Sequence, residues 1–180
     1  NQITASDATL SLADTTTCYV SVRAIDNANN VGTLATSDGV TVDTTAPTVV
    51  PVQDGTGADI DWQSSTTTLS ANWSASIDNG SGVAFYEWAV GSSSGATDIL
   101  PWTAIGNVTS ATISTLSLSE TTVYVSVRAK DKAGNYGGAG VSDGVTIDAT
   151  GPTAGIVLDG AGSDIDFQTA TNSLSANWSG

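Results

Sequence analysis

The sequence predicts an all-β protein built from tandem β-sandwich domains, and three observations lead to this prediction. Residues 19–75 align without a gap on residues 124–180 at an offset of 105, and 34 of the 57 paired positions are identical. Short runs of Val, Ile, Thr and aromatic residues alternate with clusters of Gly, Asp, Asn and Ser, a pattern typical of strands joined by turns. No segment has the sustained 3.6-residue apolar period that indicates a helix.

A repeat of about 105 residues is longer than a solenoid unit and fits an array of whole domains. The chain is expected to hold the end of one repeat (1–45, the N-terminal segment), a complete repeat (46–150, the central segment) and the start of a third (151–180, the C-terminal segment). Only the central segment is long enough to bury a core of its own. The two partial segments together are shorter than one repeat, so they could not rebuild a domain by exchange between molecules. We therefore expect the chain to be part of a longer array of repeats.

About seven strands are expected in the central segment, arranged as a two-sheet sandwich. The clearest strand covers 122–130, where Val123, Val125 and Val127 fall on one face and the intervening residues fall on the other. The other six are expected near residues 48–53, 67–74, 84–90, 100–105, 109–115 and 141–148.

Composition excludes several classes of function. Eighteen acidic and four basic residues give a formal net charge of −14. Nucleic-acid binding requires a Lys/Arg patch, so neither nucleic acid nor an anionic membrane surface is an expected partner. No apolar stretch is long enough to insert into a bilayer.

The inventory of reactive side chains also argues against an enzyme. There is no histidine, and the single cysteine, Cys18, aligns with Val123 in an alternating apolar run. We expect Cys18 to act as a small hydrophobe, with intermolecular pairing as the alternative, and no intrachain disulfide can form. Ordinary general bases and thiol nucleophiles are therefore missing. Paired carboxylates could still hydrolyse glycosides, but nothing marks a cleft that would raise the pKa of one of them.

The sequence resembles a known family across its whole length. LSANWS (69–74) resembles the second strand of fibronectin type III domains, with its core tryptophan at Trp73, and AFYEWAV (84–90) resembles the third strand. LSLSETTVYVSVRAKDKAGN resembles the stretch that runs into the sixth strand and its following loop. SDGVTIDATGP resembles the last strand and linker of the bacterial fibronectin III-like repeats, of the Ig-like superfamily, in very large surface proteins. One departure is local: Cys18 and Val123 stand at the family's tyrosine-corner position.

This resemblance implies spacing, display, adhesion or filament building rather than chemistry. The expected function is a non-catalytic structural or adhesive repeat of a long extracellular protein, such as a stalk, an adhesin extender or a fibre subunit, on a bacterial cell surface. Its expected partners are neighbouring repeats, other copies joined laterally through edge strands, and a surface glycan or receptor. The alternative is an accessory spacer or carbohydrate-binding module of a secreted polysaccharide-degrading enzyme.

The aromatic residues bear on that alternative. Trp73, its equivalent Trp178, and Trp88 are expected in the core because they fall on the apolar faces of expected strands. Trp62 and Trp102 lie near expected loops, where an exposed ring could stack on a sugar. The other interpretation is that these two side chains pack over the edge of the sandwich.

The aspartates are the most informative polar residues. Six positions carry Asp in both copies of the repeat and account for 12 of the 18 acidic residues. In a fibronectin III-like topology, Asp43, Asp78, Asp131 and Asn135 would meet where the linker enters the central segment, and Asp54, Asp59, Asp61 and Asp148 would gather at the opposite end. Convergent oxygen ligands of this kind could bind Ca²⁺ and stiffen the linkers. The alternative is that these aspartates cap turns by hydrogen bonding to local backbone.

Four sequence patterns match the N-x-S/T acceptor of N-glycosylation, and they begin at Asn72, Asn79, Asn107 and Asn177. In a chain so rich in Ser and Thr such matches arise by chance. They matter only in a source that glycosylates its proteins.

Overall fold

The computed structural model describes residues 5–179, and its regular elements over that range are all strands. The all-β prediction is therefore confirmed. The chain divides into two compact units, Asn1–Asp148 and Ala149–Gly180, and each is described by itself. Among residues 5–179 there is no helix of the length and hydrophobicity needed to cross a bilayer.

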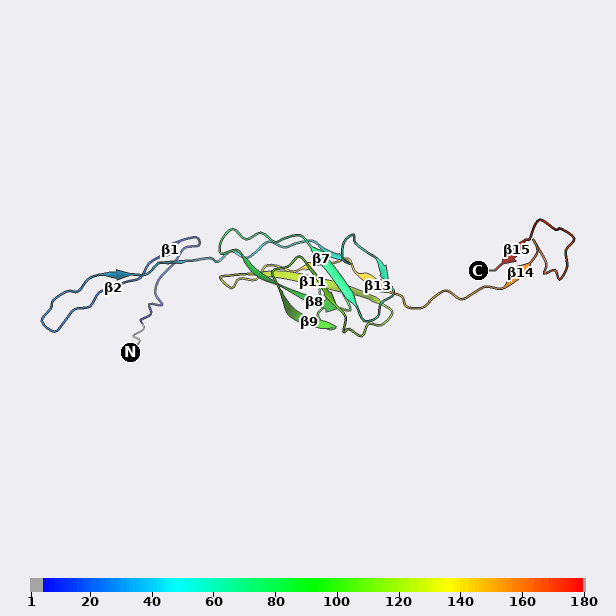
Figure 1. Ribbon diagram of the computed structural model, residues 1–180. Helices are drawn as coiled ribbons and strands as arrows, with labels where there is room; N and C mark the ends of the chain where they lie inside the picture. Colours follow the sequence, from blue (N-terminus) through cyan, green and yellow to red (C-terminus); the bar gives the residue numbers. More distant parts are fainter. Residues whose placement is uncertain (1–4, 180) are drawn as a thin grey trace. The chain divides into compact units, whose positions relative to one another are not determined.

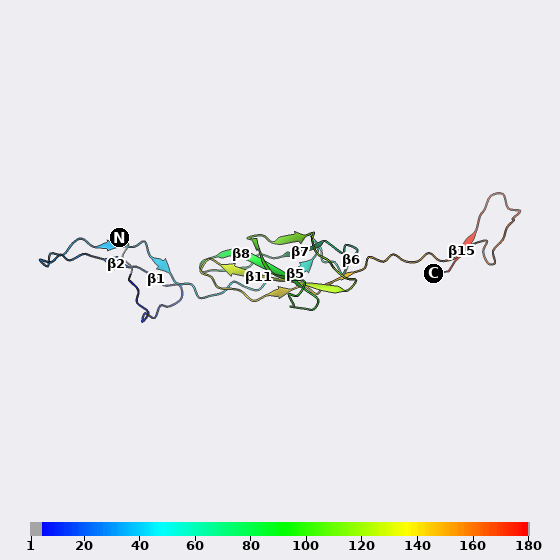
Figure 2. The ribbon, with the colours of Figure 1, turned by 90° about the horizontal axis from the view of Figure 1, so that it is seen from below.

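The larger sheet of the central segment follows the order β6-β13-β11-β8-β9. The strands β13, β11, β8 and β9 are labelled in Figure 1, and β6 is labelled in Figure 2. Its longest strand, β11 (Thr122–Asp131), pairs antiparallel with β8 (Val83–Gly91) along almost its whole length. At one edge β8 pairs with β9 (Leu100–Gly106). Towards the other edge β13 (Val145–Ile147) pairs antiparallel with β11 and parallel with the two-residue strand β6 (Trp62–Gln63), while β12 (Gly140–Val141) also pairs with β11.

A second, three-stranded antiparallel sheet has the order β10-β7-β5, and both sheets are visible together in the turned view (Figure 2). Its strands are β10 (Ser110–Ile113), β7 (Leu69–Trp73) and β5 (Val52–Asp54). Alternate residues of the strands point inward, so the two sheets enclose one apolar core. That core includes Val52, Leu69, Trp73, Tyr86, Trp88, Val123, Val125, Val127, Val145 and Ile147.

Every expected strand of the central segment overlaps an observed one. The first is shorter than expected, since β5 begins only at Val52. Upstream of it the amide of Thr48 donates to the carbonyl of Ile77, in a loop, at 2.9 Å. The expected strand 141–148 is interrupted between β12 and β13, where Gly144 has a φ of 102° that other residues rarely adopt. The strand β6 was not expected.

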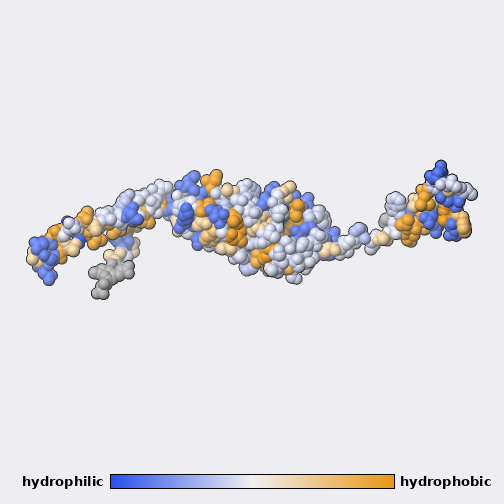
Figure 3. Space-filling view, viewed as in Figure 1, coloured by the Kyte–Doolittle hydropathy of each residue, from blue (hydrophilic) through white to orange (hydrophobic). Residues whose placement is uncertain are grey.

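The N-terminal segment forms two small antiparallel pairs. The strands β1 (Thr17–Cys18) and β4 (Val40–Thr41) make one pair, and β2 (Ser21–Val22) and β3 (Ala35–Thr36) make the other. In the C-terminal segment β14 (Val157–Asp159) pairs with β15 (Ala176–Trp178). Many apolar side chains of both segments lie at the surface (Figure 3).

Trp178 corrects an expectation. It was expected in a core because its equivalent, Trp73, falls in a strand of the same sequence, and Trp73 is indeed only 5% exposed. Trp178 is 74% exposed. In the described part of its own unit, residues 149–179, the strand pairing is that of β14 with β15, and there is no second sheet against which the ring could pack.

Candidate metal-binding sites at the two ends of the sandwich

Two groups of three aspartates each bring one carboxylate oxygen per residue within 4.8 Å of one another. The junction group consists of Asp43, Asp78 and Asp131, and the distal group consists of Asp54, Asp59 and Asp143. Asp131 ends β11, whereas Asp143 precedes β13, which pairs with the beginning of β11. The two groups therefore lie towards opposite ends of β11.

In the junction group, Asp131 is fixed by its own loop. Its Oδ1 accepts from the amides of Gly134 at 2.6 Å and Asn135 at 2.8 Å, and its Oδ2 accepts from Asn135 Nδ2 at 2.7 Å. Burial alone would raise the pKa of Asp131, but the hydrogen bonds from Asn135 and Gly134 outweigh it, so the pKa is lowered. The carboxylate is thus held ionised at the end of the strand.

Asp43 connects the linker to this loop and to a second one. Its Oδ2 accepts from the amide of Ser81 at 2.6 Å, and its carbonyl accepts from Asn135 Nδ2 at 3.0 Å. A Cβ built on Gly80 would lie 2.4 Å from the Asp43 carboxyl carbon, so this close approach requires a glycine.

Asp78 completes the junction group. Its Oδ1 accepts from the amide of Gly82 at 2.6 Å, while its Oδ2 is buried and has no hydrogen-bond partner among residues 5–179. All four residues expected at this junction are therefore brought together, with Asn135 acting as the amide that links Asp131 to the linker carbonyl.

Turn capping by an aspartate also occurs in the equivalent loop of the N-terminal segment. Asp26, the equivalent of Asp131, accepts from the amides of Ala28 and Asn30 and from Asn30 Nδ2 at 2.8–2.9 Å. Asn29 has a φ of 65° where Gly134 has a φ of 108°, so the two loops share an unusual backbone turn. Asp26 belongs to neither carboxylate group in the described part of the chain. Turn capping therefore accounts for an aspartate at these two positions without a metal.

The distal group is built around Asp54, which points inward from the end of β5 and has no exposed surface. Its backbone amide donates to Asp59 Oδ1 at 2.7 Å, and its Oδ2 accepts from the amide of Gly144 at 3.1 Å. The pKa of Asp54 is raised to about 6, mainly by burial and to a smaller degree by the charges of Asp59 and Asp143, while hydrogen bonds from the Ser142 hydroxyl and the Gly144 amide oppose the rise.

The distal group differs from the expected one in two members. Neither Asp61 nor Asp148 belongs to it. Their backbones serve the pairing of β6 with β13: the carbonyl of Asp61 accepts from Thr146 at 2.8 Å, and the amide of Asp148 donates to Gln63 at 2.9 Å. Asp143 takes their place. The sequence signal for Asp143 was its recurrence as Asp38 in the SDGVT motif.

The two tryptophans considered for ligand binding lie on opposite edge strands of the larger sheet, β6 and β9. Trp62 is 66% exposed. The guanidinium of Arg128 lies 4.3 Å from the centre of the Trp102 ring and 4.4 Å from that of Tyr136, and it pairs with Glu87 at 2.6 Å. Arg128 therefore covers a face of Trp102, and the structure does not bring the two tryptophans onto one platform.

In comparisons with known proteins, no family model matches the chain and no curated protein matches it significantly.

Proposed function

We propose that this chain is a non-catalytic structural or adhesive repeat of a long extracellular protein or filament. On this proposal the central segment is one fibronectin III-like domain in an array with a period of about 105 residues, displayed on a bacterial cell surface. The internal repeat supports the array, and the all-β fold with one two-sheet core is compatible with such a domain.

The observation that carries the proposal is the docking of the linker on the central sandwich. The side chain and the carbonyl of Asp43 bind two different loops, and Pro47, four residues further on, is buried. A linker attached at several points restricts rotation between domains, whereas a free polar linker behaves as a flexible coil. The sequence Asp43-Thr-Thr-Ala-Pro47 recurs in related form at Asp148-Ala-Thr-Gly-Pro152, so the same attachment would recur along an array.

Electron microscopy of the intact native protein tests this proposal. A fibre with a bead roughly every 30–40 Å, about the length of one sandwich by strand rise, is the expected result. A compact particle carrying only two or three beads would contradict it.

Calcium at the junction group is the second part of the proposal. The carboxylates of Asp43, Asp78 and Asp131 would supply hard oxygen ligands, and the buried Asp78 Oδ2 is the one that no donor satisfies in the described residues. An ion there would join the linker to both loops and stiffen the junction.

Melting temperatures in excess Ca²⁺ and in chelator test this second part. We expect Ca²⁺ to raise the melting temperature of the wild-type chain and of Asp26→Ala, which loses a turn cap outside the group. Asp131→Ala loses a cap and a ligand of the junction group, so its response to Ca²⁺ should be smaller than that of the other two proteins. An equal response in all three proteins would contradict calcium binding at the junction.

An accessory carbohydrate-binding role is the second candidate, and the exposed ring of Trp62 favours it. It predicts that soluble polysaccharides quench or shift the tryptophan fluorescence of the wild-type chain and that Trp62→Ala removes the response. Trp102→Ala is the matched control, because Arg128 occupies a face of that ring. Absence of any response in the wild-type chain would contradict this role.

A further inference from the structure

The connection between β5 and β6 is held by hydrogen bonds to its backbone, most of them from one side chain. A single amide nitrogen, Asn72 Nδ2, donates to the carbonyls of Gly55 at 3.1 Å and Gly57 at 3.0 Å. The amide of Gly55 donates to Ser70 at 2.8 Å. The C-terminal segment repeats the pattern, because Asn177 Nδ2 donates to the carbonyls of Gly160 and Gly162 at 2.9 Å. The loop that carries Asp54 and Asp59 is therefore ordered by its own sequence.

In the central segment the turn before the last strand, β13, contacts this loop. The amide of Gly144 donates to Asp54 Oδ2, and the Asp54 side chain has no exposed surface. In the C-terminal segment the equivalent aspartate, Asp159, makes the same hydrogen bond to Asp164 at 2.9 Å but is exposed. Burial of Asp54 is therefore a property of the assembled sandwich.

One oxygen of this buried carboxylate is left unsatisfied. Asp54 Oδ1 has no hydrogen-bond partner among residues 5–179. A buried carboxylate oxygen without a donor is costly, and the cost is relieved by a proton or by a cation. Asp59 and Asp143 each place a carboxylate oxygen within 4.8 Å of one oxygen of the Asp54 carboxylate, which concentrates negative charge around that side chain.

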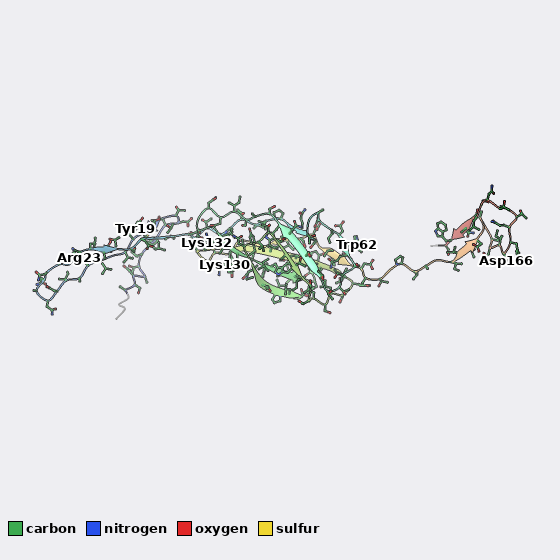
Figure 4. The ribbon with its side chains drawn as sticks, in the orientation of Figure 1. Tyr19, Arg23, Trp62, Lys130, Lys132 and Asp166 are labelled. Carbon is green, nitrogen blue, oxygen red and sulfur yellow. The ribbon has the colours of Figure 1, made fainter. Side chains whose placement is uncertain are left out.

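No basic side chain of the central segment is placed to neutralise this charge. Arg128 is paired with Glu87 and stacked between two rings. Figure 4 shows Lys130 and Lys132 near one end of the central segment and Trp62, which directly precedes Gln63 in β6, near the other. The distal group lies at the β6 end, beside the pairing of β6 with β13.

We propose that Asp54, Asp59 and Asp143 bind a divalent cation, with Ca²⁺ as the ion that fits best. One carboxylate oxygen from each of the three residues lies within 4.8 Å of the other two, so a single ion can reach all three. Ca²⁺ accepts such a flexible set of oxygen ligands with water, whereas Mg²⁺ requires near-ideal octahedral geometry. Water would complete the six to eight ligands on the exposed side, where Asp59 and Asp143 reach solvent.

Such an ion would join the first connection of the sandwich to the turn before its last strand. It would relieve the unsatisfied Asp54 oxygen and fasten the segment that runs through β13 towards the end of the domain at Asp148. This site is separate from the junction group, and it does not depend on whether the protein forms a filament.

Calcium titration of the 180-residue chain tests the proposal. Calorimetry measures the affinity, and amide chemical shifts locate the bound ion. Asp143→Asn removes one charged ligand from an exposed position, so it should fold normally. Asp38→Asn is the matched control, because Asp38 lies in the same SDGVT motif and belongs to neither carboxylate group in the described residues. Asp78→Asn serves as the background that removes a ligand of the junction group.

In the Asp78→Asn background we expect one Ca²⁺ to bind, with shifts centred on the amides of Asp54 and Gly144. Adding Asp38→Asn should leave the affinity unchanged, and adding Asp143→Asn should lower it at least tenfold. Equal affinity with and without Asp143→Asn would overturn the proposal. So would a titration in which the Asp54 and Gly144 amides do not move, which would leave Asp54 relieved by a proton alone.

Discussion

Two stretches of this chain have the same sequence, YVSVRA, and different structures. In the central segment it forms part of β11, where Val125 and Val127 are completely buried. In the N-terminal segment the equivalent residues, Val20 and Val22, are 65% and 64% exposed. The central stretch has β8 along one side and a second sheet over its face, whereas the N-terminal stretch has only short partners, of which β2 with β3 is one.

The difference shows which properties belong to the local sequence and which to the partners. The alternation of apolar and polar residues makes both stretches extended. Length and burial follow from the neighbouring strands, because β11 has ten residues and β2 has two. The hydrogen bonds to the capping aspartate of the loop that follows are similar in both places, since they are local. In the central segment Asn135 also reaches the carbonyl of Asp43.

The largest expected effect is that of a charge placed in the two stretches. Val125→Asp buries an unpaired carboxylate in the core, which costs several kcal/mol and is comparable to the whole stability of a domain. We expect the central segment to unfold. Val20→Asp should change the free energy of unfolding by less than about 0.5 kcal/mol, because the side chain is exposed.

Urea unfolding followed by the fluorescence of the buried Trp73 and Trp88 measures both variants. Equal destabilisation by Val20→Asp would mean that the N-terminal stretch packs into a core of its own, and the comparison would fail.

A smaller loss of stability is expected from a substitution at Gly140, where the backbone of the central segment is packed more closely than at the equivalent position of the N-terminal segment. A Cβ on Gly140 would lie 1.9 Å from the carbonyl oxygen of Val50, so Gly140→Ala should cost about 1–3 kcal/mol. The N-terminal segment already has Ala35 at the equivalent position, in β3. Gly138→Ala is the control, because its Cβ would meet only the end of the exposed Val49 side chain. Thermal unfolding should separate the two variants, and similar melting temperatures would contradict the close approach of the backbones.

The smallest expected effect is on the pKa of the capping aspartate that follows each stretch, Asp26 or Asp131. Hydrogen bonds from Asn30 lower the pKa of Asp26, and for Asp131 those from Asn135 and Gly134 outweigh the opposing effect of burial. A lowered pKa stabilises the folded loop above the unfolded value of 3.8 and loses that contribution as the pH falls through the folded value. Carboxyl NMR titration in chelator should therefore give midpoints below 3.8 for both aspartates.

Asn30→Ala should raise the midpoint of Asp26 only, and Asn135→Ala that of Asp131 only. If Asp26 titrated with a midpoint at 3.8 while Asp131 titrated below it, the Asp26 loop would not form by local hydrogen bonds alone. It would then depend on strands that pack beside β11 but not beside β2.

The contrast between local sequence signals and contacts with partner strands also explains which parts of the fold the sequence could predict. Each expected strand was found because its alternation or its aromatic content is a local signal. The two-residue strand β6 was missed because so short a run has no period, and it exists only through its parallel pairing with β13. Trp178 was misplaced for the converse reason: its motif is that of a core strand, but core burial requires a second sheet.

The candidate sites divide in a similar way. At the junction, residues predicted from fold topology lie together, because the ends of strands fix where their loops meet. At the distal end Asp143 replaces Asp61 and Asp148. Which residue of a turn faces a neighbouring loop depends on backbone angles such as the positive φ of Gly144, and spacing along the sequence does not report them.

The amide of Asn72 has one further consequence, for covalent modification. Asn72 begins an N-x-S/T pattern, and the nitrogen to which a glycan would be attached is the one that binds the carbonyls of Gly55 and Gly57. A sugar there would replace one of the two N–H donors, so at least one of these bonds would be lost and the loop would be held less firmly. In a host that glycosylates its secreted proteins, the folded domain therefore offers the exposed Asn79 and Asn107 to the transferase and withholds Asn72.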